Sequence, residues 1–192
     1  MNTSTSDHLH RESALRSIGR NVVNFQRLEQ CIKFVSRFSD IEGPLGKIHK
    51  IEEVRLSGLS KFTMGQAVAE IARIIQNDHR PLPITKDLFE PWVSRTFDFL
   101  LDPVTARTCC EELSALVIER NHLIHNRLAA VDFYSLEQCA SLIEALDSQN
   151  TKILKQLEVF GPLVTALRQM LREAEEYVNS AEFLAQLQSA AT

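Results

Sequence analysis

Residues 136–178 read LEQCASLIEALDSQNTKILKQLEVFGPLVTALRQMLREAEEYV, and apolar side chains recur along them in alternating steps of three and four. This heptad spacing predicts one long helical segment with a continuous apolar stripe. Asn150 falls within the stripe, as single polar residues do where they fix the alignment of packed helices. Gly161-Pro162 predicts a kink or a break, because proline lacks the N–H that a helix needs. The stripe consists of Leu136, Cys139, Ile143, Leu146, Asn150, Ile153, Leu157, Phe160, Val164, Leu167, Leu171, Ala174 and Val178.

Two interpretations of this long segment remain open. It packs on the first helix of the chain as part of a bundle, or it protrudes as a coiled-coil arm. From Asp132 to the end the chain carries nine acidic and four basic residues. Since RNA is an anion, we expect a protein partner rather than RNA on this acidic region.

Similar signals predict the helices that precede it. Apolar residues step by three and four from Ser13 to about Phe38, which predicts a long amphipathic helix. Thr63 with Gln66 forms a capping box at the start of a second helix. A shorter helix is expected over residues 87–101. Asp102-Pro103 then reads as an N-cap followed by a first-turn proline.

The remaining segments lack a clear period. Residues 39–62 combine charges with glycine and proline, which predicts a loop or short helical turns. Residues 1–12 are polar and are expected to be disordered. The 192 residues, 44% hydrophobic and 24% charged, are typical of one globular domain. We therefore expect an all-α bundle of about five main helices, with residues 13–192 as a single domain.

Composition narrows the function classes. A net charge of −4 argues against a protein that coats nucleic acid nonspecifically, although it allows a local basic cleft. No apolar run is long enough to cross a membrane, and no signal peptide is evident, so a cytoplasmic protein is expected. The cysteines lie in apolar helical patterns without metal-site spacing, which predicts reduced core thiols and no cofactor. They are Cys31, Cys109, Cys110 and Cys139.

Residues 119–127, which read ERNHLIHNR, hold the candidate catalytic groups. Asn121 and His125 are four residues apart and share a face of an α-helix, with Arg120 beside them. RNA cleavage by its own 2′-hydroxyl needs a proton acceptor, a proton donor and positive charge on the phosphorane. Histidine performs either proton transfer, and arginine binds phosphate oxygens through its planar fork. Because one helix edge supplies one well-placed histidine, we expect a homodimer that pairs two edges.

The run Arg120-Asn121-x-x-x-His125 resembles the R-x(4–6)-H signature of HEPN-domain proteins. The resemblance implies a small helical protein that cleaves RNA without a metal, with its motifs meeting at a dimer interface. It also implies a role as a toxin, silenced by an antitoxin, or as a defence factor. One subgroup of these toxins carries a modified tyrosine two residues after the histidine. Arg127 stands at that position here, so we expect a phosphate contact in place of that modification.

A polar stripe on the first predicted helix is a second candidate for RNA binding. It consists of Arg16, Arg20, Asn24 and Arg27. This stripe is either a solvated helix face or a ridge that contacts phosphates. Glu29 falls in the apolar register, where a charge needs a partner, and Arg120 is the partner we expect.

Alternatives to a nuclease also follow from the sequence. His125 fits a hydrogen-bonded core or interface histidine, and Arg120 fits an ion-pair partner of Glu29 or Glu119. His122 points to another side of the helix and is expected to be peripheral. The chain would then be a catalytically silent HEPN-like binding module, or an adaptor that uses the 136–178 stripe as a coiled coil.

Overall fold

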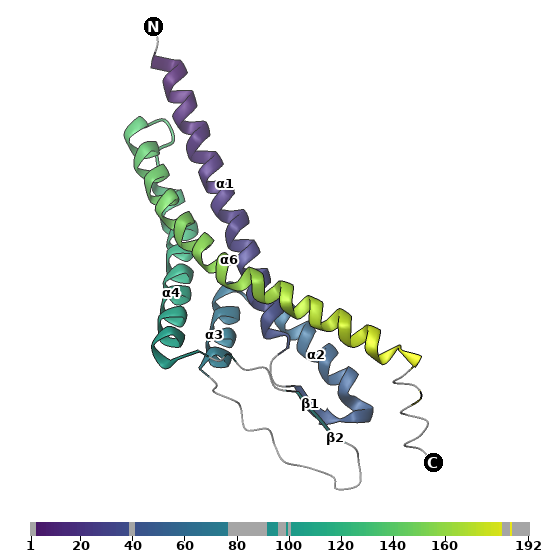
Figure 1. The fold of residues 1–192 in the computed structure, drawn as a ribbon. Helices are drawn as coiled ribbons and strands as arrows, with labels where there is room; N and C mark the ends of the chain where they lie inside the picture. The colour runs from purple at the N-terminus through teal and green to yellow at the C-terminus, as the bar shows by residue number, and fades with distance from the viewer. Residues whose placement is uncertain are drawn as a thin grey trace.

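The computed structural model describes residues 3–38, 41–76, 92–95, 99, 101–181 and 185. The fold is all-α, as predicted, and the helices form a bundle around two long members (Figure 1). Within the described ranges, no helix combines the length and apolarity that crossing a bilayer requires. The helices are α1 (Thr3–Ser36), α2 (Ile48–Ser60), α3 (Met64–Ile75), α4 (Pro103–His122), α5 (Leu128–Ala130) and α6 (Leu136–Val178).

Helix α6 packs along α1, so the bundle interpretation of the heptad stripe is confirmed. The stripe residues from Cys139 to Leu167 are buried or half-buried, whereas Leu171 is exposed. The helix continues through Pro162 without a break, and its axis turns along its length (Figure 1). The predicted long C-terminal helix is therefore one helix rather than two.

Two hydrophobic clusters form the core. The larger joins the C-terminal half of α1 to α3, α4 and the middle of α6, with Leu28, Ile71, Leu113 and Ile153 fully buried. The smaller contains Leu123 and links the end of α4 to the first turns of α6. Burial of such side chains contributes about 1.5–3 kcal/mol each before the entropy of ordering is subtracted. The end of α4 is thus anchored on both long helices.

The predicted start signals of two helices are confirmed. Thr63 accepts a hydrogen bond from the backbone of Gln66, and the Gln66 side chain accepts one from the backbone of Thr63. Asp102 accepts from the backbone amides of Val104 and Thr105, with Pro103 in the first turn of α4. These contacts fix where α3 and α4 begin.

Three predicted segments differ from the structure. Helix α1 already begins at Thr3, so the disorder predicted for residues 1–12 is wrong for residues 3–12. Residues 41–60 hold strand β1 (Ile41–Pro44), the 3₁₀ turn η1 (Leu45–Lys47) and the full helix α2, rather than a loop or short turns.

The helix predicted over residues 87–101 is also wrong where the structure describes it. Strand β2 (Trp92–Arg95) pairs antiparallel with β1, and Ile41 lies opposite Arg95. The indole nitrogen of half-buried Trp92 donates a hydrogen bond to Glu42 Oε1 at 2.7 Å. Short apolar runs fit either a helix or a strand, and here a distant partner strand decides. The rest of the predicted helix, apart from Phe99 and Leu101, lies outside the described residues.

Candidate functional site

The stretch with the candidate catalytic groups is not a regular α-helix. Helix α4 ends at His122, and residues Leu123–Arg127 form the π turn η2. The backbone N–H of Leu128 donates to the carbonyl of Leu123, five residues earlier, which is the hydrogen bond of a π turn. Leu123 itself is buried in the smaller core cluster, so the turn is held in place at its first residue. Turns of this kind occur often at functional sites.

The predicted catalytic residues lie around this junction. Arg120 is half-buried and its Nη1 donates to Asn121 Oδ1 at 3.2 Å. Asn121 and His125 are exposed. The predicted alignment of Asn121 with His125 assumed α-helical spacing, which ends at His122. Arg120 and Asn121 therefore contact each other, whereas His125 presents its ring to solvent from the π turn.

Arg120 lines an open cleft of about 660 Å³ between α1 and α4, which we call the α1–α4 cleft. Exposed Arg27 lines the same cleft, so the structure brings a predicted RNA-binding arginine beside the predicted catalytic Arg120. Among the described residues, neither forms an ion pair with a carboxylate. The lining consists of Val23, Gln26, Arg27, Glu29, Gln30, Cys31 and Arg120.

Glu29 does not pair with Arg120 as predicted, although both line the α1–α4 cleft. It forms an ion pair with Lys33, four residues along the same helix, at 2.7 Å. The other carboxylate considered for Arg120, Glu119, pairs with Lys152 on α6. Both carboxylates are therefore already neutralised, which leaves the charge of Arg120 for another group.

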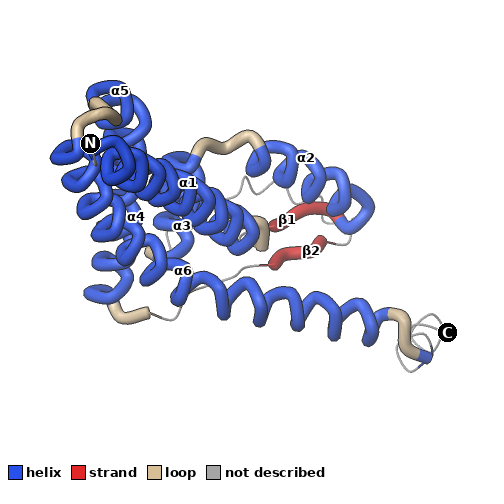
Figure 2. Tube along the Cα trace, turned by 90° about the horizontal axis from the view of Figure 1, so that it is seen from above, coloured by secondary structure: helices blue, strands red, loops and turns tan. Residues whose placement is uncertain are grey.

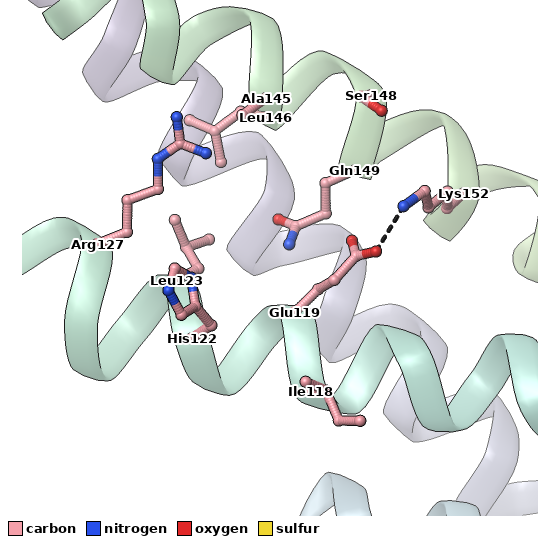
Figure 3. A pocket seen from close by; sticks show the side chains of 10 residues that line it. All are labelled: Ile118, Glu119, His122, Leu123, Arg127, Ala145, Leu146, Ser148, Gln149 and Lys152. Carbon is pink, nitrogen blue, oxygen red and sulfur yellow. Dashed lines mark hydrogen bonds and ion pairs between the residues drawn. The ribbon is translucent and has the colours of Figure 1, made fainter.

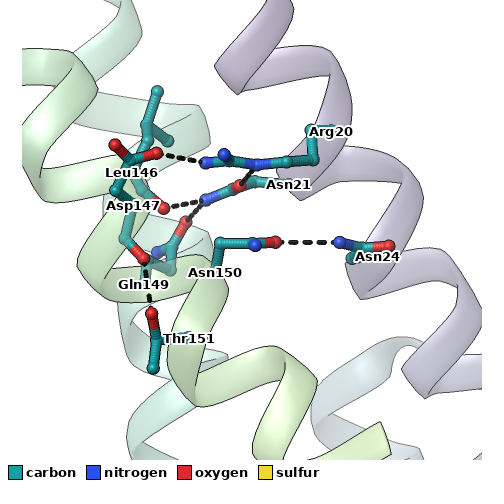
Figure 4. Close-up of polar contacts among 8 residues, drawn as sticks. All are labelled: Arg20, Asn21, Asn24, Leu146, Asp147, Gln149, Asn150 and Thr151. Atoms are coloured by element: carbon teal, nitrogen blue, oxygen red, sulfur yellow. Dashed lines mark hydrogen bonds and ion pairs between the residues drawn. The ribbon is translucent and has the colours of Figure 1, made fainter.

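The other members of the polar stripe on α1 have protein partners in this structure. Arg16 pairs with Glu12 at 3.1 Å, and Arg20 pairs with Asp147 of α6 at 2.8 Å. Asn24 is buried between the helices, where its Nδ2 donates to Asn150 Oδ1 at 2.8 Å (Figure 4). Asn24 therefore faces α6 rather than the solvent that a phosphate contact needs, whereas Arg16 and Arg20 are exposed beside their ion-pair partners.

A second cleft, of about 380 Å³, lies between the α4–η2 junction and α6 (Figure 3); we call it the α4–α6 cleft. It contains His122, which the sequence placed at the periphery, and Arg127, a predicted phosphate contact. Residues five apart point about 140° from each other in an α-helix. The π turn brings His122 and Arg127 to one cleft. The sequence could have predicted this pair only if the π turn had been known. The lining consists of Ile118, Glu119, His122, Leu123, Arg127, Ala145, Leu146, Ser148, Gln149 and Lys152.

The four cysteines are free thiols, as predicted. Burial raises the pKa of Cys109 to about 11 and raises those of Cys31 and Cys110. These thiols are therefore protonated at neutral pH and are poor nucleophiles. In the described part of the chain, no three His, Cys, Asp or Glu side chains gather as metal ligands would.

Comparison of the chain with protein families, with curated proteins and with solved structures finds no match. We therefore infer a function from the chemistry of the residues themselves.

Proposed function

We propose that this protein is a metal-independent endoribonuclease of the HEPN type that acts on cytoplasmic RNA as a homodimer. The observation that carries the proposal is the α1–α4 cleft, where Arg27 and Arg120 from two helices face one space without a carboxylate partner among the described residues. Two unneutralised guanidinium groups beside one cleft favour a phosphate as the third group.

The chemistry assigns a role to each motif residue. His125 accepts the proton of a ribose 2′-hydroxyl, and the oxygen then attacks the adjacent phosphorus. The bond from phosphorus to the 5′-oxygen breaks, and the 5′-oxygen takes a proton from His125 of the second copy. The products are a 2′,3′-cyclic phosphate and a 5′-hydroxyl. Arg120, oriented by its contact with Asn121, stabilises the charge on the phosphorane.

The exposure of His125 supports a dimeric site. A histidine in open solvent lacks the partner groups that orient a catalytic ring, and one copy supplies one such histidine. Exposed apolar residues Val104 and Ile118 lie on the same helix as Arg120. A second copy that packs on α4 would bury them and bring the motif-bearing ends of two α4 helices together.

Cleavage of single-stranded RNA in the presence of EDTA tests the proposal. We expect 2′,3′-cyclic phosphate ends, and DNA should remain intact because it lacks the attacking hydroxyl. Arg120→Ala and His125→Ala should each lower the rate on the order of 100-fold or more. His122→Ala should change the rate little, and exposed Arg172→Ala on α6 is the control for lost surface charge. Activity that requires Mg²⁺, or that survives His125→Ala, would contradict the mechanism.

The role of a toxin would require an antidote protein. The end of α6 offers a surface for such a partner, because Met170, Leu171 and Tyr177 are exposed apolar residues within the acidic region. An antitoxin with a basic, partly apolar face fits this surface.

A catalytically silent binding module is the second candidate. It is favoured by one observation, namely that His125 does not line the α1–α4 cleft, where Arg120 lies. RNA binding through Arg27 and Arg120 with no detectable cleavage would support this candidate over the nuclease.

A further inference from the structure

Gln149 lines the α4–α6 cleft, and the orientation of its side-chain amide is fixed by its neighbour Asn21. The side chain of Asn21 is fully buried, and its Nδ2 donates to the carbonyl of Leu146 at 2.8 Å (Figure 4). The Oδ1 of Asn21 accepts from Arg20 Nε at 3.1 Å, which confirms this orientation. The same Nδ2 lies 3.1 Å from Gln149, so the atom of Gln149 that faces it must be the acceptor Oε1.

It follows that the Nε2 of Gln149 is turned away from Asn21. Gln149 is only 8% exposed, and its amide projects into the cleft from α6 (Figure 3). Among the described residues, nothing accepts a hydrogen bond from this nitrogen. A donor that opens onto the cleft and lacks a protein partner is free to bind a ligand with an acceptor at this point.

Positive charge lies at one end of the cleft. The Nη2 of half-buried Arg127 donates to the carbonyl of Ser141 at 3.1 Å, which holds the guanidinium against α6. Its remaining N–H groups have no carboxylate partner in the described part of the chain. His122 lies beside it, and the Lys152–Glu119 ion pair closes the opposite end (Figure 3). An anionic group of the ligand therefore belongs at the Arg127 end.

The floor between these ends is apolar. Leu123 and Leu146 are buried beneath the cleft, and Ile118 stands exposed at its rim. A floor of this kind suits a flat ring, and a volume of about 380 Å³ is within the range of small-molecule sites. Amide side chains often form hydrogen bonds with the edge of a nucleobase.

We infer that the α4–α6 cleft binds a nucleoside monophosphate, with its phosphate at Arg127 and its base edge at Gln149. The ligand is either a free nucleotide or one nucleotide of an RNA strand, since both present the same groups. The inference does not depend on the proposed nuclease, because Arg120 and His125 do not line this cleft.

Isothermal titration of the full chain with AMP, GMP, CMP and UMP tests this inference. We expect at least one to bind with a Kd below about 1 mM, and more tightly than inorganic phosphate or the matching nucleoside. Arg127→Gln should weaken binding about tenfold or more, because it removes a charge-assisted contact. Gln149→Glu should do the same, since it keeps the acceptor for Asn21 but removes the N–H donor from the cleft.

Lys155→Met is the matched control. Lys155 pairs with Glu112 across the same two helices, as Lys152 does with Glu119, but it lies outside the cleft. Nucleotide affinity should not change in this variant. Equal losses for Lys155→Met and Arg127→Gln would overturn the inference, as would the absence of binding by every nucleotide and by a ten-residue RNA.

Two further measurements distinguish a free nucleotide from an RNA strand, and this binding site from the proposed nuclease. If a mononucleotide binds as tightly as the RNA, the ligand of the cleft is a free nucleotide. If only the RNA binds, and Gln149→Glu abolishes that binding, the ligand is one nucleotide of an RNA strand. Both results support the inference. Nucleotide affinity should persist in His125→Ala. Binding without RNA cleavage would refute the nuclease and uphold this site, whereas cleavage without binding at the cleft would do the reverse.

Discussion

Amide side chains form hydrogen bonds across the interface between the two long helices, α1 and α6. Asn24 meets Asn150, and Asn21 meets Gln149, next to the Arg20–Asp147 ion pair (Figure 4). The heptad stripe identified Asn150 as an aligning residue, but the sequence assigned Asn24 to an RNA-binding ridge. An asparagine such as Asn24 can face solvent, RNA or another amide, and its environment is known only once the position of the partner helix is known.

Removal of one partner of the Asn24–Asn150 hydrogen bond should destabilise the protein more than replacement of both. Asn24→Ala leaves Asn150 without its partner in a largely apolar interface, so we expect a loss of about 1–3 kcal/mol in the free energy of unfolding. Asn24→Leu combined with Asn150→Leu replaces both groups by apolar ones and should lie closer to the wild type. Urea unfolding followed by circular dichroism measures both. A double variant that loses more than the single variant would contradict this account.

Cys109 should make the stability of the fold depend on alkaline pH. Burial raises the pKa of its thiol from 9.0 to about 11, so the folded state holds the proton more tightly than the unfolded state. The corresponding stabilisation is fully present below pH about 9 and is lost as the pH rises through about 11. Between pH 8 and about 10.5, the free energy of unfolding should therefore fall more in the wild type than in Cys109→Ala. Equal falls would show that Cys109 does not titrate in this way.

The helices differ in how far the sequence specifies them. Helices α1, α3, α4 and α6 have long apolar periods or capping residues, and each was predicted. The β1–β2 pair and α2 were missed, because four-residue strands carry too short a pattern and depend on a partner distant in the chain. The π turn η2 has no signature in the apolar period either. For this reason the clefts that the candidate residues face could not be predicted from the sequence.

A π turn is equivalent to one extra residue within an α-helix, so removing one residue should restore α geometry. Deletion of exposed Asn126 should leave the melting temperature unchanged or higher, because the helix on either side keeps its contacts. RNA cleavage should fall on the order of 100-fold, since the rewound turn moves His125 relative to Asn121. Thermal melting and the RNA assay measure the two effects.

Deletion of exposed Ser114 is the control for this experiment. It lies within the regular part of α4, where loss of one residue turns the following buried side chains, Leu116 and Leu123, away from the core. We expect this variant to melt at a much lower temperature. If both deletions destabilise the protein equally, the π turn is a structural requirement rather than a device for placing His125.

The described part of the chain is an elongated bundle, and two of its surfaces expose apolar side chains beside a candidate interface. The end of α6 extends away from the other helices (Figure 2), and its side chains from Arg168 to Glu173 are exposed. The outer face of α4 is the second surface, with Val104 and Ile118 60% and 69% exposed. Exposed apolar residues scattered singly are normal, but two that share the outer face of one helix favour an interface.

The final prediction connects assembly to activity. If a second copy covers the outer face of α4, Val104→Asp should dissociate the dimer, because a two-fold axis places the new charge in the interface twice. Cleavage should disappear in parallel, and dilution of the wild type below its dimer dissociation constant should have the same effect. Light scattering gives the mass, and the RNA assay gives the rate.

Val54→Asp is the matched control for Val104→Asp, since Val54 is 65% exposed on α2. It introduces the same charge at a similar exposure but away from α4, so it should leave both mass and activity unchanged. Added phosphate or RNA should strengthen the wild-type dimer, because an anion bound between two copies of Arg120 relieves the repulsion of like charges. A monomer that cleaves RNA at the full rate would refute the shared site. A stable dimer that is insensitive to Val104→Asp would place the interface elsewhere, and would favour the silent binding module because His125 would then remain in open solvent.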